Sequence, residues 1–284
     1  MYIGGAFVRS ESGHTLTTGA EAGGAAATGA QSQEVICRGS RKDVRDAVKA
    51  ALGAQPSWRG KSAYLRGQIL YRLAEVMESR REELEERLLR GGAEAKAATR
   101  EVDTAIDRVV TFAGWSDKYQ SLLASSNPVV GPHFGFSVPE PVGVVGIVAP
   151  SRPSLLGLVG AVCPVVVSGN TAVVLVSEAD PITALTLAEC FATSDFPGGV
   201  VNLLTGLGAE LIEPLVRHKG VRALDLWGVE DERARQLEAF AADSVKRVTR
   251  RIYEEIDWYD AAASGLGFIE PFLETKTVWH PMGV

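Results

Sequence analysis

Cysteine and histidine are scarce in this sequence, and their scarcity removes several classes of site. The 284 residues include three cysteines and four histidines. Neither set has the close spacing of zinc ligands, and an odd number of widely separated cysteines does not make a disulfide framework. We therefore expect no metal site and no disulfide bonds, and a reducing, cytoplasmic setting fits best.

Long apolar runs and blocks of positive charge are also lacking. The most apolar segment, 142–176, is interrupted by Arg152, by three prolines and by Asn170, so it offers no clean stretch of about 20 residues to cross a membrane. The net charge is −6 without a cluster of lysine and arginine, which makes nucleic acid and anionic membranes poor partners. We expect no secretory signal, because the N-terminus lacks a basic region before an apolar run.

Hydrophobic periodicity divides the chain into a helical region and an alternating region. Amphipathic patterns predict three helices, at about 41–53, 62–90 and 99–123. Four apolar runs follow, at 142–150, 171–176, 200–206 and 221–228, and each is followed by a helical pattern, the last over 230–251. This order predicts a doubly wound parallel α/β sheet. Such sheets bind ligands beyond the carboxyl ends of their strands.

Two further segments have the pattern of exposed β-strands. Residues 132–141 form a predicted β-ribbon, and FLETKTVW at 272–279 alternates on two distinct faces. A terminal strand must pair with a strand of this chain or of another. We therefore divide the chain into a scaffold domain, 1–131 with 142–262, and an oligomerisation element, 132–141 with 263–284.

PVGVVGIVAP, SGNTAVVLVSE and VVNLLTG follow one another in an order that resembles the cofactor-binding domain of the aldehyde dehydrogenase superfamily. YIGGAFV near the start and ETKTV near the end extend the resemblance over nearly the whole chain. The resemblance implies a Rossmann-like fold. Active members carry a catalytic domain inserted before the closing strand, and that insert is predicted to be absent here. The pattern is most similar to the short, non-catalytic second half of aldehyde dehydrogenase family 16.

The positions that hold NAD(P) in this superfamily carry different residues. Leu175 stands where the motif GNTAVVKPSE has its lysine, although Glu178 remains. The phosphate-binding turn keeps Gly228, but Val229 replaces its serine, and three acids at 230–232 fill the first turn of the next helix. Those carboxylates would repel a pyrophosphate. We therefore expect no bound cofactor; a weak NAD(H)-binding regulatory module that uses Glu178 is the alternative.

The catalytic groups that the resemblance implies are also missing. None of Cys37, Cys163 and Cys190 stands in the family's nucleophile setting, and Arg152 takes the place of the oxyanion-binding asparagine. The carboxylate base that the resemblance implies is missing as well. The prediction is a non-catalytic subunit; an active NAD(P)-dependent aldehyde oxidoreductase with an unrecognised site is the remaining alternative.

The exposed strands are the predicted docking element. In the superfamily the corresponding strands join subunits, so the partner is expected to be a full-length aldehyde dehydrogenase or a second copy of this chain. The predicted partner-binding residues are Phe134, Phe136, Val138, Phe272, Thr275, Thr277 and Trp279.

Overall fold

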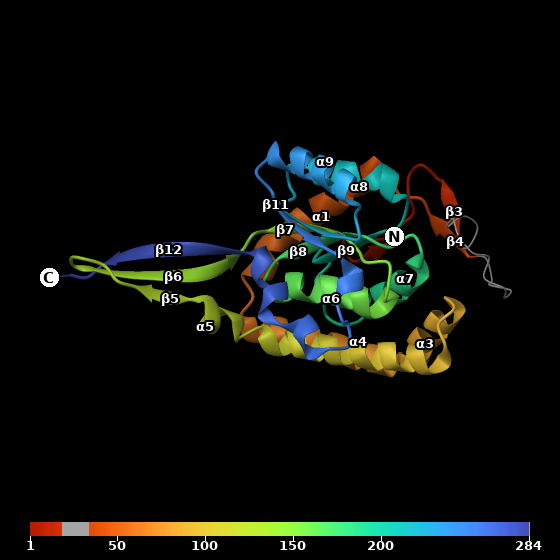
Figure 1. The fold of residues 1–284 in the computed structure, drawn as a ribbon, viewed down its shortest axis with the longest axis horizontal. Coiled ribbons are helices and arrows are strands. Elements are labelled where there is room, and N and C mark those ends of the chain that lie inside the picture. Colours follow the sequence, from red (N-terminus) through yellow and green to blue (C-terminus); the bar gives the residue numbers. More distant parts are fainter. Residues whose placement is uncertain (19–33, 284) are drawn as a thin grey trace.

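A seven-stranded sheet forms the centre of the computed structural model, which describes residues 1–18 and 34–283 (Figure 1). Its order is β11-β10-β7-β8-β9-β1-β2. The strands are β1 (Tyr2–Ile3), β2 (Ala6–Phe7), β7 (Val144–Val148), β8 (Thr171–Leu175), β9 (Val201–Leu204), β10 (Ala223–Trp227) and β11 (Arg247–Arg251). The strands β7 to β11 pair in parallel, and the β1–β2 hairpin adds to β9 in antiparallel fashion.

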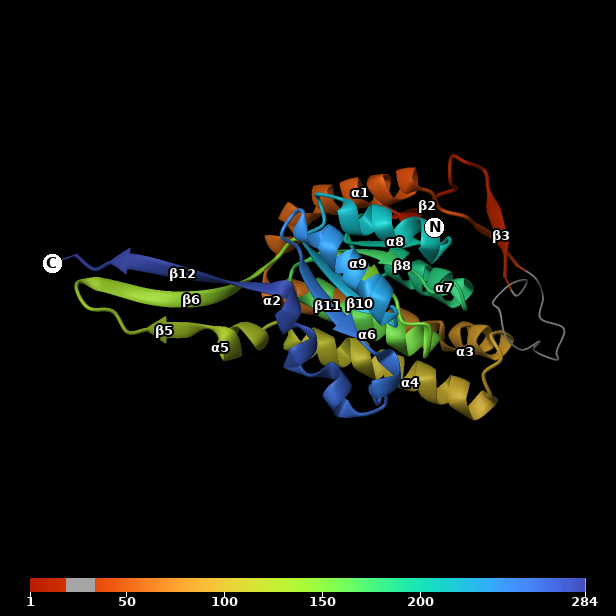
Figure 2. The same ribbon diagram turned by 45° about the horizontal axis from the view of Figure 1, so that its top comes forward.

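Helices cover both faces of this sheet (Figures 1 and 2). One face carries α1 (Arg41–Arg59), α8 (Gly208–Arg217) and α9 (Asp231–Ala242). The other carries α6 (Ser154–Val167) and α7 (Pro181–Ala192). A further layer on that side consists of α2 (Ala63–Ser79), α3 (Arg81–Arg90) and α4 (Ala95–Trp115). The predicted doubly wound α/β fold is confirmed.

Side-chain alternation along the central strands divides the core in two. In β8, Ala172 and Val174 pack with α6, whereas Val173 and Leu175 pack with α1, α8 and α9. All four side chains are buried. A strand with a helical layer on each face needs apolar residues at every position, which explains the uninterrupted run in the sequence.

Polar residues fix where the helices begin. Asp180 accepts the N–H three residues further on at 3.2 Å, and Pro181 occupies the first position of α7, as predicted. At α6 the cap comes from another helix: Glu101 of α4 accepts the N–H groups of Leu155 and Leu156 at 2.8 and 3.1 Å. Burial raises the pKa of the Glu101 carboxyl.

A second sheet, with the order β12-β6-β5, projects from the body as an antiparallel ribbon (Figure 1). Its strands are β5 (Ser125–Asn127), β6 (His133–Pro141) and β12 (Leu273–Pro281), and the short α5 (Tyr119–Leu123) precedes them. The pair β3 (Thr15–Thr17) and β4 (Val35–Cys37) lies apart. The predicted strands at 132–141 and in the tail are confirmed.

The segment 252–272, here called the strap, connects β11 to β12. It contains four short 3-10 helices, η1 (Tyr253–Glu255), η2 (Ala261–Ser264), η3 (Leu266–Phe268) and η4 (Glu270–Phe272). Arg108 of α4 donates hydrogen bonds to the backbone oxygens of Trp258 and Asp260, at 2.6 and 3.2 Å. The strap is therefore fastened to the helical layer beside α6.

Several predicted helices have other boundaries in the structure, and the one predicted over 99–123 is divided into α4 and α5. The helix predicted over 230–251 ends at Ala242, the chain turns at Val245 with a φ of +52°, and 247–251 forms the fifth parallel strand. That prediction was wrong because RVTRR is an edge strand. Its three arginines leave it without the continuous apolar run that marks the buried strands. The pattern at 62–90 forms α2 and α3, which meet at Arg80.

Candidate functional sites

The carboxyl edge of the parallel sheet is the first candidate site. Leu175 is the last residue of β8 and is only 4% exposed, because its side chain packs into the core under α1, α8 and α9. Its backbone oxygen accepts the N–H of Ala149 at 3.0 Å. Leu175 therefore holds strands and helices together and presents no charge at this edge.

Glu178 and Gly228 mark the two turns that a ligand at this edge would meet. Glu178 Oε1 accepts the N–H of Gly208, the first residue of α8, at 2.7 Å. Gly228 follows β10 with a φ of +63°, a conformation that favours glycine. Its N–H donates to the backbone oxygen of Arg251 at 3.0 Å, and Val229 packs partly buried against the α1 side of the core.

Acids follow at the start of α9, as predicted. Glu230 is the N-cap residue, but its side chain caps no N–H group. Asp231 forms an ion pair with Arg250 of β11. The first turn of α9 therefore keeps free backbone donors, while its side chains are mostly anionic.

A buried charged cluster at the end of β10 escaped the sequence analysis. Asp225 is 1% exposed; Arg251 Nε donates to its Oδ1 at 3.0 Å, and Trp227 Nε1 donates to its Oδ2 at 2.7 Å. Burial raises the pKa of the Asp225 carboxyl, although the Arg251 charge and both hydrogen bonds lower it in part. The one available signal was an aspartate inside the apolar run ALDLW.

The three cysteines form no disulfide. Burial raises the pKa of Cys163 to about 12 and that of Cys190 to about 11. A thiol in this state is a poor nucleophile. Arg152, at the position of the family's asparagine, is exposed in the loop after β7.

We expect one thiol to react in the native protein. The thiolate is the reactive species, so Cys163 and Cys190 stay inert near pH 8, whereas the half-buried Cys37 is open to reagent. Treatment with iodoacetamide and measurement of the intact mass should show a single adduct on the native chain and three on the denatured chain. A native chain that carries two or three adducts would contradict this assignment.

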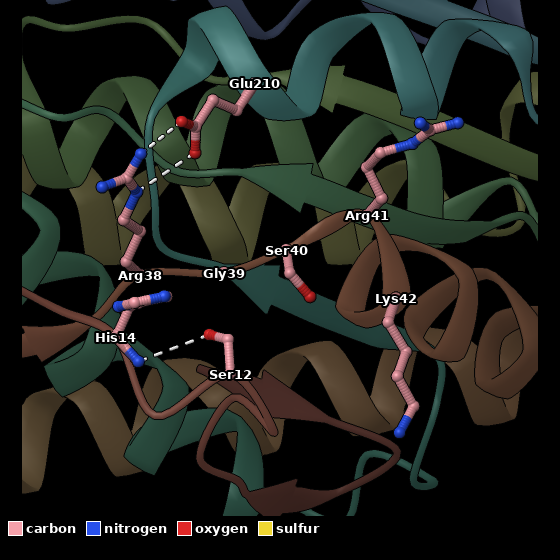
Figure 3. Close-up of a pocket in the computed structure, with 8 residues that line it drawn as sticks. All are labelled: Ser12, His14, Arg38, Gly39, Ser40, Arg41, Lys42 and Glu210. Carbon is pink, nitrogen blue, oxygen red and sulfur yellow. Dashed lines mark hydrogen bonds and ion pairs between the residues drawn. The ribbon is translucent and has the colours of Figure 1, made fainter.

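A cavity of about 690 Å³ opens between the start of α1 and the first turn of α8 (Figure 3). It is lined by Ser12, His14, Arg38, Gly39, Ser40, Arg41, Lys42 and Glu210. These residues come from three segments, 12–14, 38–42 and 210, that are far apart in sequence. No single sequence motif therefore predicts the cavity. Figure 3 shows Arg38 reaching toward Glu210, and this ion pair neutralises one of the cations.

Other groups beside this cavity are already satisfied within the chain. Lys42 pairs with Glu11. Asp43 accepts hydrogen bonds from Ser40 N at 2.8 Å and from Ser40 Oγ at 2.7 Å, and so caps the start of α1. Two of the basic residues that line this cavity, Arg38 and Lys42, are therefore already paired with carboxylates.

The ribbon is the second candidate site. Phe134, Phe136 and Val138 share one face of β6, and the rings of Phe134 and Phe136 lie 5.6 Å apart. Phe134 is 47% exposed. On the opposite face β12 carries three of the predicted partner-binding residues, which are Thr275, Thr277 and Trp279. Trp279 is 62% exposed, so both faces present aromatic side chains to solvent.

Phe272 does not belong to this exposed set. It lies in η4 and is fully buried in the main core, while its backbone oxygen accepts hydrogen bonds from Asn170 at 2.9 Å and from Val142 at 3.2 Å. The prediction that Phe272 contacts a partner was wrong. The closing strand begins one residue later, and the body of the protein already covers this ring.

A sequence profile of the aldehyde dehydrogenase family matches residues 25–251. The chain belongs to the aldehyde dehydrogenase family. It is 34% identical over 253 residues to the DhaS protein of Bacillus subtilis (strain 168), covering 88% of this chain and 49% of DhaS. It is 33% identical over 257 residues to the cytosolic 10-formyltetrahydrofolate dehydrogenase of Mus musculus, covering 88% of this chain and 28% of that protein.

Solved structures agree with this assignment. The NAD+ complex of the aldehyde dehydrogenase from Bacillus cereus matches 89% of this chain and 50% of its own, with a TM-score of 0.79 and 26% identity. This aldehyde dehydrogenase family member thus spans about half the length of these relatives, or less. The resemblance to the superfamily is confirmed; the closer likeness to family 16 stays a prediction.

The expectation that no cofactor binds is contradicted by the same comparisons. NAD complexes stand among the similar structures, including those of the B. cereus enzyme, of PnpE and of betaine aldehyde dehydrogenase from Staphylococcus aureus. The leucine at position 175 does not by itself exclude NAD. One charged hydrogen bond contributes only about 1.5–3 kcal/mol, whereas the carboxylate of Glu178 and the free N–H groups of α9 remain at the edge.

The groups at this edge fit a dinucleotide in part. Glu178 can accept ribose hydroxyls, and the backbone donors at the start of α9 suit a phosphate. Leu175 and Asp231 contribute nothing to either contact. In the described residues no group of three or more histidine, cysteine, aspartate or glutamate side chains could hold a metal ion. No helix in that part of the chain is long and apolar enough to cross a membrane.

Proposed function

We propose that this chain is a non-catalytic subunit of an aldehyde dehydrogenase assembly. It docks on an aldehyde dehydrogenase subunit through the free edge of β12. The observation that carries the proposal is an edge strand of nine residues, almost all exposed, held away from the body by its pairing with β6 (Figure 1). An open edge of this length is a template for a strand from another chain.

The backbone hydrogen bonds at both ends of the β12–β6 pair indicate which groups face this edge. Phe272 O accepts from Val142 N, and Met282 N donates to Pro132 O. In an antiparallel pair such bonded positions alternate, so even-numbered residues of β12 bond to β6. Pro139, which has no N–H, accordingly lies opposite an odd-numbered residue. The residues whose N–H and C=O groups point outward are therefore Thr275, Thr277 and Trp279.

The strap supports a non-catalytic role. It runs directly from β11 to β12, where the family resemblance implies an inserted catalytic domain. Trp258 of the strap is 5% exposed and packs on Trp227, with 5.1 Å between the ring centroids. The chain thus covers the end of β10 with its own residues. The high pKa values of Cys163 and Cys190 point the same way, because neither thiol can serve as a nucleophile at neutral pH.

Thr275→Pro tests the proposed docking. Proline there removes an outward N–H and no bond to β6, and prolines are tolerated on edge strands. We expect the tagged chain to capture an aldehyde dehydrogenase subunit from the cells that make both, with identification by mass spectrometry. The variant should capture at least about tenfold less, with little change in its unfolding temperature.

Ser126→Pro is the matched control for this experiment. Even-numbered residues of β6 bond to β12, so its odd-numbered residues bond to β5. Ser126 lies opposite the even-numbered Phe136, and its N–H therefore points to the opposite edge of the ribbon. Its replacement should leave capture unchanged. Equal loss in both variants, or a wild-type chain that associates only with itself, would contradict docking through β12.

The NAD complexes of related structures favour a second candidate function, NAD(H) binding at the carboxyl edge as a regulatory signal. NADH fluorescence should saturate at concentrations below about 1 mM. Glu178→Gln should weaken binding several-fold, because it removes a charged acceptor for ribose hydroxyls. Glu230→Gln should strengthen it, because it removes a negative charge beside the phosphates. A titration without saturation, or one that neither variant alters, would exclude this site.

A further inference from the structure

A line of four polar side chains crosses the ribbon from β5 to the free edge of β12. Ser125 Oγ donates to Asn127 Oδ1 at 3.0 Å, and Asn127 Nδ2 donates to Ser137 Oγ at 2.8 Å. Ser137 Oγ lies 2.8 Å from Thr277 Oγ1. Ser137 is 7% exposed, so these partners satisfy a hydroxyl that solvent hardly reaches.

The hydrogens along this line give it a direction. An amide nitrogen only donates, and a serine hydroxyl has one hydrogen and two lone pairs. Either hydroxyl can donate between Ser137 Oγ and Thr277 Oγ1. Ser137 is 7% exposed, and among the described residues Thr277 Oγ1 is the one oxygen in reach of its hydrogen, so the arrangement that leaves no buried hydrogen unpaired has Ser137 as the donor. Thr277 is then the acceptor in the last bond, and its hydroxyl hydrogen is left over. Within residues 1–18 and 34–283, no other side chain lies within hydrogen-bonding distance of this hydroxyl.

Thr277 stands where an added strand would lie. It is exposed, it is near the middle of β12, and its backbone groups point away from β6. A strand paired to this edge places one side chain directly opposite Thr277 on the same face, with the Cβ atoms about 4.5–5.5 Å apart. The neighbouring side chain is thus in hydrogen-bonding reach of the Thr277 hydroxyl.

We propose that the aldehyde dehydrogenase strand which docks on β12 carries an aspartate, asparagine or glutamine oxygen opposite Thr277. This inference rests on the proposed function and adds the chemistry of the partner strand to it. With Ser137 as the donor, the hydroxyl hydrogen of Thr277 is available at the free edge, and an oxygen on the partner strand can accept it. An apolar side chain in that place would leave the hydrogen of the Thr277 hydroxyl without an acceptor in a closed interface, which is unfavourable.

Three variants of the tagged chain test the direction of the line. For each we measure the affinity for the aldehyde dehydrogenase that the wild-type chain captures, after that protein has been purified. Thr277→Val keeps the shape and removes the donor, so we expect affinity to fall about tenfold. Thr277→Ser should restore it to within about threefold, because serine keeps the hydrogen. Asn127→Asp leaves β12 untouched but replaces the donor with an acceptor. Ser137 then donates to the carboxylate and accepts from Thr277, so affinity should fall as in Thr277→Val.

Ser126→Asp controls for the charge in Asn127→Asp. It places a carboxylate one residue away on the other face of β5 and should leave affinity within about twofold. Equal affinity of wild type, Thr277→Val and Asn127→Asp would overturn the inference and leave docking through β12 intact. If the wild-type chain binds no aldehyde dehydrogenase at all, the proposed function is overturned. The inference about an acceptor on the partner strand is then overturned as well.

Discussion

Trp258→Ala is expected to lower the free energy of unfolding by about 3–5 kcal/mol. The ring is 5% exposed and packs on Trp227. It also lies against Gly160 of α6, where an added Cβ would come within 2.7 Å of it. Arg108 holds the backbone oxygen of Trp258 at 2.6 Å, so the strap cannot move in to fill the space. The alanine variant is therefore left with a cavity.

Urea unfolding followed by circular dichroism measures this effect, and Trp279→Ala is the matched control. The same substitution on the ribbon removes a ring that is 62% exposed, so the free energy of unfolding should change by less than about 0.5 kcal/mol. Capture of an aldehyde dehydrogenase should weaken instead. A loss below about 1 kcal/mol in Trp258→Ala would show that the strap is not part of the core.

The sheet and the ribbon could be predicted because their burial leaves a periodic signal. β8 is apolar from Ala172 to Leu175 since Val173 and Val174 meet helices on opposite faces. β6 and β12 alternate because each has two unlike faces. The start of α7 at Asp180 could also be predicted, because an N-cap and a proline act only through neighbouring backbone groups.

The features that escaped prediction depend on distant partners. β11 reads as charged because it is an edge strand, and Arg251 is placed by Asp225 on the neighbouring strand. Phe272 lies within an alternating pattern, yet the end of the strand and the core fix it inside. The line from Asn127 to Thr277 joins residues 150 positions apart in sequence through Ser137. The sequence contains these residues but not their register.

The carboxyl edge shows a different limit. The replacement at Leu175 and the acids at 230–232 are visible in sequence. Ligand binding at this edge also depends on backbone N–H groups, which do not vary with the side chain. Backbone N–H groups at the start of α9 are not encoded by side-chain identity. The loss of cofactor-binding side chains therefore does not remove the backbone N–H groups at the start of α9, which the fold retains.

Arg251→Met is expected to destabilise the protein by about 3–5 kcal/mol at about pH 8 and by less at about pH 5. The substitution leaves Asp225, which is 1% exposed, without its cationic partner at 3.0 Å. Burial already raises the pKa of Asp225, and the Arg251 charge opposes that rise. Its removal should raise the pKa further, because only Trp227 then stabilises the carboxylate.

The direction of the pH dependence follows from this shift. In the unfolded chain an aspartate has a pKa of about 3.9. A folded pKa above that value means that the folded state binds more protons between the two pKa values. Stability is therefore fully present below the unfolded pKa and falls as pH rises through the folded pKa. In Arg251→Met this fall should be steeper and should extend to higher pH than in the wild type.

A double-variant cycle separates the charge of Arg251 from its packing. Asp225→Asn combined with Arg251→Met leaves no buried charge, so it should recover most of the lost stability and abolish the difference between pH 5 and pH 8. The guanidinium also lies 5.2 Å from the Trp227 ring centroid and 4.6 Å from that of Phe268. A double variant as unstable as Arg251→Met at both pH values would mean that the ring contacts of Arg251, and not its ion pair with Asp225, account for the lost stability.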